Sequence, residues 1–441
     1  MNKKQLLTLI IIIMMILTGC EKTGNSINTK EGNASCSDEP SSFIGNPAAF
    51  YCTNVMGYEY QVITEDDGAQ KGQCIMPDEQ ACDQWAFYAG ECGQEYSYCA
   101  SEGMSIETRY DGNDPYSSTY GVCIGGSEER SEFKISDIIN FNLKPSEKAP
   151  SEKETRTGDL PVASDSIRAS LPAHFDWRDI DGHDWMTPVK NQGGCGSCWA
   201  FSAVGALEPY YNFINNNPDL NLDLSEENLV SDCFYTGCDG GWTEDALIYA
   251  RDVGIVDEVC MPYTATDSAC ASMCVDPERY TTDQVVWDYY TLDVDTLKYL
   301  IVNYGPVSVY LKMDGDWNGD IYECDALEEW DTNHAVVVVG YDDPGQYWIV
   351  KNSWGTDMYG GEDGYFKVGF NQCNINTTFY AYLPTNFLNT YLPLLSTSGT
   401  PFTIKPILTS PSEGQIINTL KPTITWEIDN SLHDLSYIYY Q

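Results

Sequence analysis

The sequence has 441 residues, of which 42% are hydrophobic and 13% aromatic, a composition typical of folded domains and not of a disordered chain. This length exceeds that of a typical single domain, so two or three domains are expected. With 66 acidic and 23 basic residues the formal net charge is −43, which excludes binding to nucleic acid or to an anionic lipid surface by charge attraction. We interpret the charge as a solvated acidic surface.

The first twenty residues predict export from the cytoplasm. Lys3 and Lys4 precede an apolar run over residues 6–17, which is the layout of a secretory signal peptide. The run is too short to span a bilayer comfortably, so an uncleaved anchor is the weaker alternative. It ends in Leu-Thr-Gly-Cys at residues 17–20, which resembles the bacterial lipoprotein processing signal and implies cleavage before Cys20 and lipid on its thiol. We therefore expect an extracytoplasmic protein held by lipid on the bacterial cell membrane or outer membrane, with secretion as the alternative.

Seventeen cysteines and only four histidines indicate disulfide bonds and not metal binding. The histidines do not follow Cys-x-x-Cys pairs at the spacing of a zinc site, and so many thiols are unusual in the cytosol. We expect disulfides formed in an oxidising compartment, and no metal or cofactor.

The N-terminal half predicts a signal peptide over residues 1–19, a polar tether over 20–45 and a cysteine-rich domain over 46–128. The cysteine-rich domain contains a faint repeat, in which a Tyr-Cys pair is followed by a glycine and a second cysteine. Each copy predicts a small strand-and-turn unit held by its own disulfide. The repeated positions are Tyr51, Cys52, Gly57 and Cys74 in the first copy and Tyr98, Cys99, Gly103 and Cys123 in the second.

The first copy, from Asn46-Pro47-Ala48 to Glu91-Cys92, resembles a short uncharacterised domain of bacterial secreted proteins that is often labelled haemolysin-like. The label carries no mechanism that these residues support. A binding or inhibitory accessory domain and a disulfide-held spacer both remain open.

The chain beyond this domain divides by composition. Residues 129–170 are charged and polar, which predicts a linker or a cleavable pro-segment. Residues 171–384 alternate helix-like and strand-like segments, which predicts the largest domain. A linker over 385–409 leads to residues 410–441, which resemble the opening strands of an immunoglobulin-like or fibronectin-like sandwich. Because such a sandwich needs about seven strands, this one is incomplete.

Cys198 is the candidate nucleophile. It follows a glycine-rich turn over residues 192–197 and precedes an apolar segment over 199–207 with helical spacing. A thiol at a helix N-terminus faces the positive end of the helix dipole, which stabilises the thiolate.

His334 is the best candidate for the base. It opens an apolar strand over residues 335–339, so that its ring projects from a rigid element, whereas the other three histidines lie in turn-like sequence or in the C-terminal tail. Asn352, at the end of a second apolar strand, is suited to orient the imidazole. Trp354 would shield that hydrogen bond from water.

The sequence from 171 to 384 closely resembles the papain family of cysteine peptidases. Residues 195–199 read Cys-Gly-Ser-Cys-Trp, and His334 and Asn352 follow at about the family's distance of 130–150 residues. Further landmarks occur in the family's order at residues 171–172, 175–178, 224–230, 237–241, 305–307, 352–355 and 364–366.

The resemblance implies an α+β fold of two halves, one helical and one barrel-like, with the cleft between them. It implies that Gln192 donates its amide to the oxyanion, and that Gly240 and Gly241 run beside the extended substrate. The Asn333 carbonyl would meet the substrate near the scissile bond. Four residues without acidic side chains would line the main specificity pocket and favour an apolar substrate residue: Trp242, Thr243, Ala335 and Thr378.

The resemblance also implies disulfides in the largest domain. These are Cys195–Cys238, Cys233–Cys270 and Cys324–Cys373, with Cys260 and Cys274 left to pair with each other. In this scheme Cys36, in the tether, is the cysteine most expected to stay unpaired.

Three features depart from the family or mislead. Pro209 should kink or end the helix that begins at Cys198. Residues 314–325 nearly fit a calcium-binding loop, but a strand-like segment precedes them where a helix should be. The region before Leu171 lacks the long helical pro-region of many relatives, so the sequence does not explain how the enzyme is kept inactive during export.

The function expected is therefore a monomeric endopeptidase that hydrolyses polypeptides through an acyl-enzyme on Cys198. The alternative is a catalytically idle protein that keeps the fold for surface binding. The joint presence of Cys198, His334, Asn352 and Gln192 favours the enzyme.

Overall fold

The computed structural model describes residues 44–125, 132–139, 171–234, 237–282, 284–288, 291–324, 331–376 and 380–383, and the backbone of 407–410 and 425–427. The predicted signal peptide, Cys20, Cys36 and Thr378 lie outside these ranges. No helix in the described ranges is long and apolar enough to cross a membrane.

Residues 44–125 and 132–139, here called the N-terminal region, contain one small unit twice. In each unit a short helix precedes a three-stranded antiparallel sheet, ordered β1-β2-β3 and then β4-β5-β6. Disulfides join Cys52 to Cys74 and Cys99 to Cys123 at matching positions of the two units. The elements are α2 (Pro47–Phe50), the π-helix η1 (Tyr51–Val55), β1 (Glu59–Thr64), β2 (Gln70–Ile75), β3 (Ala81–Asp83), α3 (Gln84–Ala89), η2 (Gln94–Tyr96), α4 (Tyr98–Ser101), β4 (Ser105–Arg109), β5 (Tyr120–Ile124), β6 (Glu132–Lys134) and η3 (Ile135–Ile138).

Two expected boundaries of this region differ from the structure. Ile44 and Gly45, assigned to the tether, are buried, and Ile44 is only 1% exposed. Strand β6 lies within the expected linker 129–170, where it pairs with β5, and Ile135 after it is fully buried. An unpaired strand edge leaves backbone N–H and C=O groups without partners, and β6 supplies those partners to β5.

The described part of residues 171–383, here called the main region, is built on a nine-stranded sheet. The strand order is β10-β11-β14-β13-β12-β9-β15-β8, with β7 paired to β12. The strands are β7 (His174–Asp176), β8 (Val286–Asp288), β9 (Val307–Leu311), β10 (Asp316–Asn318), β11 (Ile321–Glu323), β12 (His334–Asp342), β13 (Tyr347–Lys351), β14 (Tyr365–Gly369) and β15 (Tyr380–Tyr382). The helices are α6 (Cys198–Ile214), α7 (Glu227–Val230), η4 (Gly237–Asp239), α8 (Thr243–Asp252), η5 (Cys270–Ser272) and α9 (Val294–Tyr304).

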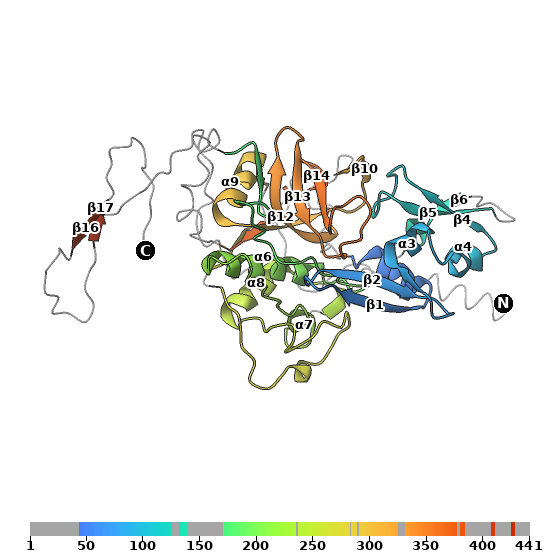
Figure 1. Ribbon diagram of the computed structural model, residues 1–441, viewed down its shortest axis with the longest axis horizontal. Helices are drawn as coiled ribbons and strands as arrows, with labels where there is room; N and C mark the ends of the chain where they lie inside the picture. The colour runs from blue at the N-terminus through green and yellow to red at the C-terminus, as the bar shows by residue number, and fades with distance from the viewer. Residues whose placement is uncertain are drawn as a thin grey trace, which may run out of the picture. The chain divides into compact units, whose positions relative to one another are not determined.

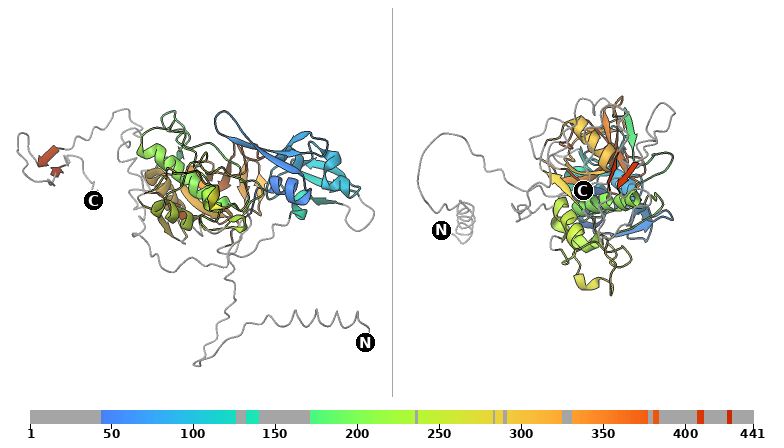
Figure 2. Two further views of the ribbon diagram at one scale, coloured as in Figure 1. Left: turned by 90° about the horizontal axis from the view of Figure 1, so that it is seen from below. Right: turned by 90° about the vertical axis from the view of Figure 1, so that its left-hand side faces the viewer.

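Helix α6 is the central helix of the main region and is almost wholly buried. Together with α8 it lies below strands β12–β14 in Figure 1 and in front of them when viewed from below in Figure 2. Ser202 donates a hydrogen bond to the Val336 carbonyl of β12, and a Cβ on Gly205 would lie 3.4 Å from Val337. The small residues of α6 therefore let the helix approach the strand that carries His334. The helix continues through Pro209 to Ile214, so the proline does not end it.

Seven disulfides lie in the described ranges. Besides the two of the repeat, Cys82 is joined to Cys92. Three others have the pairings that the family resemblance implied, Cys195–Cys238, Cys233–Cys270 and Cys324–Cys373, and the two cysteines left over, Cys260 and Cys274, pair with each other as expected. Cys198 is the one described cysteine outside a disulfide.

The C-terminal segment contributes two short strands to the description. Strands β16 (Ile407–Ser410) and β17 (Thr425–Glu427) pair antiparallel. Strand β16 begins within the expected linker 385–409, and the remainder of the expected partial sandwich lies outside the described residues.

Candidate active site

The Cys198 side chain sits at the first residue of α6 and is completely buried. Burial raises the pKa of the thiol to about 12, and backbone N–H groups of Ala335 and Trp199 offset part of this rise. The thiol is therefore protonated in this state of the protein, even though a helix N-terminus favours the thiolate.

His334 is the first residue of β12, where it is held by the pairing of this strand with β9. Its Nε2 lies 2.8 Å from Asn352 Oδ1, which also accepts the Ser353 N–H. Since Oδ1 can only accept, Nε2 carries the proton and Nδ1 has the free lone pair. Nδ1 is buried and has no hydrogen-bond partner among the described residues. Burial lowers the pKa of His334 to about 4, so the ring is neutral.

Trp354 covers the histidine. Its ring stacks on the His334 ring with centroids 4.6 Å apart and an interplanar angle of 30°. Both side chains are fully buried, so the indole excludes water from the bond between His334 and Asn352.

Gln192 presents its amide N–H groups in a fixed direction. Its Oε1 accepts hydrogen bonds from Ser353 Oγ at 2.7 Å and from Trp354 Nε1 at 3.1 Å. The amide nitrogen therefore points the other way, where it donates to the Cys195 carbonyl at 2.8 Å. A side chain held by this many partners is suited to stabilise a developing oxyanion without reorganisation.

The residues expected to bind substrate lie around α6 and α8. A Cβ on Gly241 would lie 2.5 Å from the Trp199 ring, and Gly240 has a φ of 117°, so both positions favour glycine. Thr243 is fully buried and donates to the Trp199 carbonyl at 3.2 Å. Trp242 and Ala335 are also buried.

The calcium-like loop gives no support to a metal site. The described residues contain no group of three His, Cys, Asp or Glu side chains placed to hold an ion, and Asp325 lies outside them.

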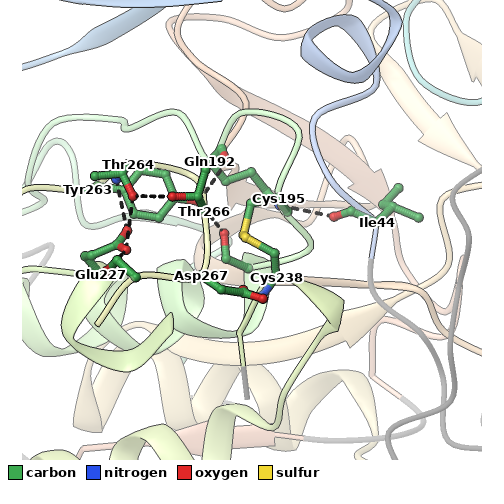
Figure 3. Close-up of a disulfide and its surroundings, with 11 residues drawn as sticks. Ile44, Gln192, Cys195, Glu227, Cys238, Tyr263, Thr264, Thr266 and Asp267 are labelled. Atoms are coloured by element: carbon green, nitrogen blue, oxygen red, sulfur yellow. Dashed lines mark hydrogen bonds between the residues drawn. A yellow bond between two sulfur atoms is a disulfide. The ribbon is translucent and has the colours of Figure 1, made fainter. Parts of the chain in front are cut away.

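The sequence analysis missed residues 44–46, which form hydrogen bonds with residues of the candidate site. The Ile44 N–H donates to the Asn333 carbonyl at 2.9 Å, and Gln192 Nε2 donates to the Ile44 carbonyl at 3.1 Å (Figure 3). The Asn46 N–H donates to the Gly193 carbonyl at 2.8 Å. The Asn-Pro pair at 46–47 is a recognisable helix start, but a local signal does not say what the helix will contact.

Comparison with known proteins identifies the two regions. Residues 171–383 match the family described as papain family cysteine protease. The main region is a papain-family cysteine protease domain. Residues 44–91 match a family described as a domain of unknown function, DUF333.

Relatives of the protease domain include curated and solved proteins. The chain is 36% identical over 229 residues to a cathepsin L-like proteinase of Fasciola hepatica, which covers 48% of this chain and 65% of that protein. It is 37% identical over 220 residues to cathepsin L of Sarcophaga peregrina, covering 46% of this chain and 61% of that protein. The solved digestive procathepsin L2 proteinase of Tenebrio molitor larval midgut is 37% identical, with a TM-score of 0.44, over 50% of this chain and 70% of that one.

The chain thus spans less than two thirds of the two curated relatives. The predicted α+β, papain-like fold with a disulfide-rich N-terminal region is confirmed. The disulfides and the cathepsin-like relatives indicate an extracellular or secreted protein.

Proposed function

We propose that the protein is an endopeptidase that cleaves polypeptides through Cys198. The observation that carries the proposal is the bond of 2.8 Å between Asn352 and His334, which leaves Nδ1 as the proton-accepting nitrogen on a ring in the family's catalytic position. The alternative, an idle binding protein, does not explain why all four polar groups of the reaction are present and oriented.

The proposed reaction uses these groups in sequence. The Cys198 S–H proton passes to His334 Nδ1, and the sulfur attacks the substrate carbonyl carbon. Gln192 Nε2 donates to the oxyanion that forms. The C–N bond breaks as His334 returns the proton to the leaving amine, and water then hydrolyses the thioester with His334 again accepting a proton.

The direct test is labelling by an epoxysuccinyl peptide, which alkylates a catalytic thiol in a formed site. Because Cys198 is completely buried and residues 44–46 bind Gln192 and Asn333, the full chain should be assayed as wild type and with Gly45→Val, since a Cβ at Gly45 would lie 2.6 Å from the Gly194 oxygen. We expect one label on Cys198 and cleavage of unfolded casein by the Gly45→Val chain. Reductant should be kept low enough to preserve the disulfides.

A Cys198→Ala chain in the same background serves as the control and should neither be labelled nor cleave. Cleavage that persists in this control would contradict the nucleophile assignment. Accessible Cys198 that reacts with iodoacetamide, but not with the epoxysuccinyl peptide, would favour the idle binding protein.

We further propose that the protein is a monomer outside the cytoplasm, held by lipid on Cys20 after removal of residues 1–19. The signal-like sequence and the disulfides support this location. Intact-mass analysis of the mature N-terminus would test it, because an unmodified Cys20 or an uncleaved residue 1 would contradict the lipid anchor.

A further inference from the structure

We propose that the N-terminal region is an inhibitor of the chain's own protease domain, with residues 44–46 seated in the catalytic site in place of a substrate. This goes beyond the peptidase function and rests on it, since an inhibitor needs an activity to restrain.

The main chain of Ile44 occupies the groups that a substrate would need. Its N–H is taken by the Asn333 carbonyl and its C=O by Gln192 Nε2, the donor assigned to the oxyanion. A peptide and the 44–46 segment therefore compete for the same two hydrogen-bonding groups. The burial of Ile44, Gln192, Cys198 and His334, all at most 1% exposed, means that the site is closed.

Asn46 binds both the N-terminal region and the protease domain. Its Oδ1 accepts the Ala48 N–H at 3.0 Å and so caps helix α2 of the N-terminal region. Its Nδ2 donates to Asn191 Oδ1 at 3.1 Å and to the Trp354 carbonyl at 3.2 Å in the protease domain. Gly45, between Ile44 and Asn46, lies so close to the Gly194 backbone that no side chain fits there.

Helix α3 and strand β2 of the first repeat also bind the protease domain. Gln84 Nε2, at the start of α3, donates to the Trp354 carbonyl at 3.0 Å and to Asp357 Oδ1 at 2.9 Å. The Gln70 N–H of β2 donates to the Val189 carbonyl at 2.9 Å, and the Gln70 carbonyl accepts the Thr356 N–H at 3.0 Å. These bonds are directed and largely buried, as in a specific interface.

The second repeat holds the protease domain at a separate place. The Trp317 N–H of β10 donates to the Gly112 carbonyl at 2.9 Å, and a Cβ on Gly112 would lie 2.4 Å from the Trp317 oxygen. The Ser118 N–H donates to the Tyr359 carbonyl at 3.2 Å. Because disulfides hold the N-terminal region together, its two contact sites prevent it from sliding or rotating on the protease domain, as an inhibitor requires.

The closed state also keeps the chemistry silent. With the thiol pKa raised and the imidazole pKa lowered by burial, Cys198 and His334 are both neutral. A neutral thiol is a poor nucleophile, so Ile44 can lie on the site without being cleaved.

The interface contains a carboxyl pair that makes closure depend on pH. Asp357 Oδ2 is buried and has no donor among the described residues, while the Asp83 carboxyl faces it. Burial and Asp83 raise the pKa of Asp357 to about 8. The other titratable groups that face this pair are Tyr60, Lys71 and Tyr359.

The closed state thus holds a proton that an exposed Asp357 would lose. The Asp357 proton makes closure weaken as the pH rises toward 8, whereas the lowered pKa of His334 weakens closure as the pH falls below about 6.5. The pKa of His334 is about 4 in the closed state and near the ordinary 6.5 in an open site, so its ring is neutral in both states above pH 6.5. Between pH 6.5 and 8 the Asp357 proton therefore determines the pH dependence. In this range the ratio of open to closed chains should increase by up to about tenfold per pH unit. Asp357→Asn, whose amide can donate to Asp83, should remove this dependence, while Asp363→Asn on the surface should keep it.

The test measures how fast iodoacetamide alkylates Cys198 in the full chain at a fixed pH, because this small reagent needs an accessible thiolate but none of the substrate-binding groups. Asn46→Ala and Gly45→Val should each raise the rate constant at least about tenfold over wild type at pH 6.5. Asn113→Ala, which removes an exposed asparagine of the same region, should leave it unchanged. Parallel labelling by the epoxysuccinyl peptide shows that the opened chains remain folded at the site.

Equal alkylation of wild type, Gly45→Val and Asn46→Ala would overturn the inhibitor inference whatever the epoxysuccinyl result. Wild-type protein cut between Ile44 and Gly45 on intact-mass analysis would also overturn it, because the segment would then be a substrate. Faster alkylation without epoxysuccinyl labelling, in variants whose unfolding temperature is unchanged, would instead contradict the peptidase function and leave the closure established.

Discussion

In the Gly45→Val background, His334→Ala should lower kcat/KM for an unfolded protein substrate by at least about a thousandfold. The imidazole has two tasks, to accept the Cys198 proton and to return it to the leaving amine. The main chain cannot replace either task, and Asn352 carries an amide that does not exchange protons at neutral pH. Fluorescent casein hydrolysis at pH 6.5 measures the effect.

The matched control is His174→Ala. This histidine is exposed and lies 3.1 Å from Asp342 on β12, so its loss tests the general effect of removing a histidine next to the same strand. Activity should stay within about twofold. Added imidazole should restore part of the lost activity to His334→Ala, and a His334→Ala chain that keeps more than a tenth of the activity would assign the base elsewhere.

Asn352→Ala should have a smaller effect than His334→Ala. Trp354 still stacks on the imidazole and limits its rotation when the amide is removed. Equal losses in the two variants would mean that Asn352 determines more than the orientation of the ring.

The candidate catalytic groups could be proposed from the sequence because each is tied to a local pattern. Cys198 follows a glycine-rich turn and opens an apolar helix, and α6 begins at this residue. His334 and Asn352 were expected at the ends of apolar strands; β12 begins at His334, and β13 ends at Lys351, immediately before Asn352. Such patterns can be recognised in the sequence because the helix and the strands are buried on all sides and are therefore rich in apolar residues.

The contact of Ile44 with Gln192 could not be predicted in the same way. The two residues are 148 positions apart, and the bond is formed by a backbone carbonyl, which is the same for every residue type. The same holds for β6, whose pairing with β5 satisfies backbone groups and leaves little trace in the side chains. Sequence patterns report which face of an element is buried, and they do not report which distant segment buries it.

Gln192 takes part in both the proposed reaction and the proposed inhibition, so its replacement should lower turnover and raise the access of reagents to Cys198. In the Gly45→Val background Gln192→Ala should lower kcat/KM by about a hundredfold to a thousandfold, equivalent to about 3 to 4 kcal/mol of lost oxyanion stabilisation. In the otherwise wild-type chain the same change removes a hydrogen bond to Ile44, so iodoacetamide should reach Cys198 faster. Because loss of a residue that only supported the fold would also raise access and lower turnover, an unchanged unfolding temperature in both variants is the control that separates the two cases.

The isosteric change Gln192→Glu sharpens this argument. A carboxylate keeps the size of the amide but loses both N–H donors and places a negative charge beside the oxyanion, so turnover should fall further than in Gln192→Ala. The same charge would face the Ile44 carbonyl oxygen and should open the site at least as much. Gln61→Ala, an exposed change on β1, should alter neither quantity. If Gln192→Glu lowered turnover but left Cys198 as protected as in the wild type, the 44–46 segment would be held by Asn46 and the repeat contacts alone, and the oxyanion donor would have no part in inhibition.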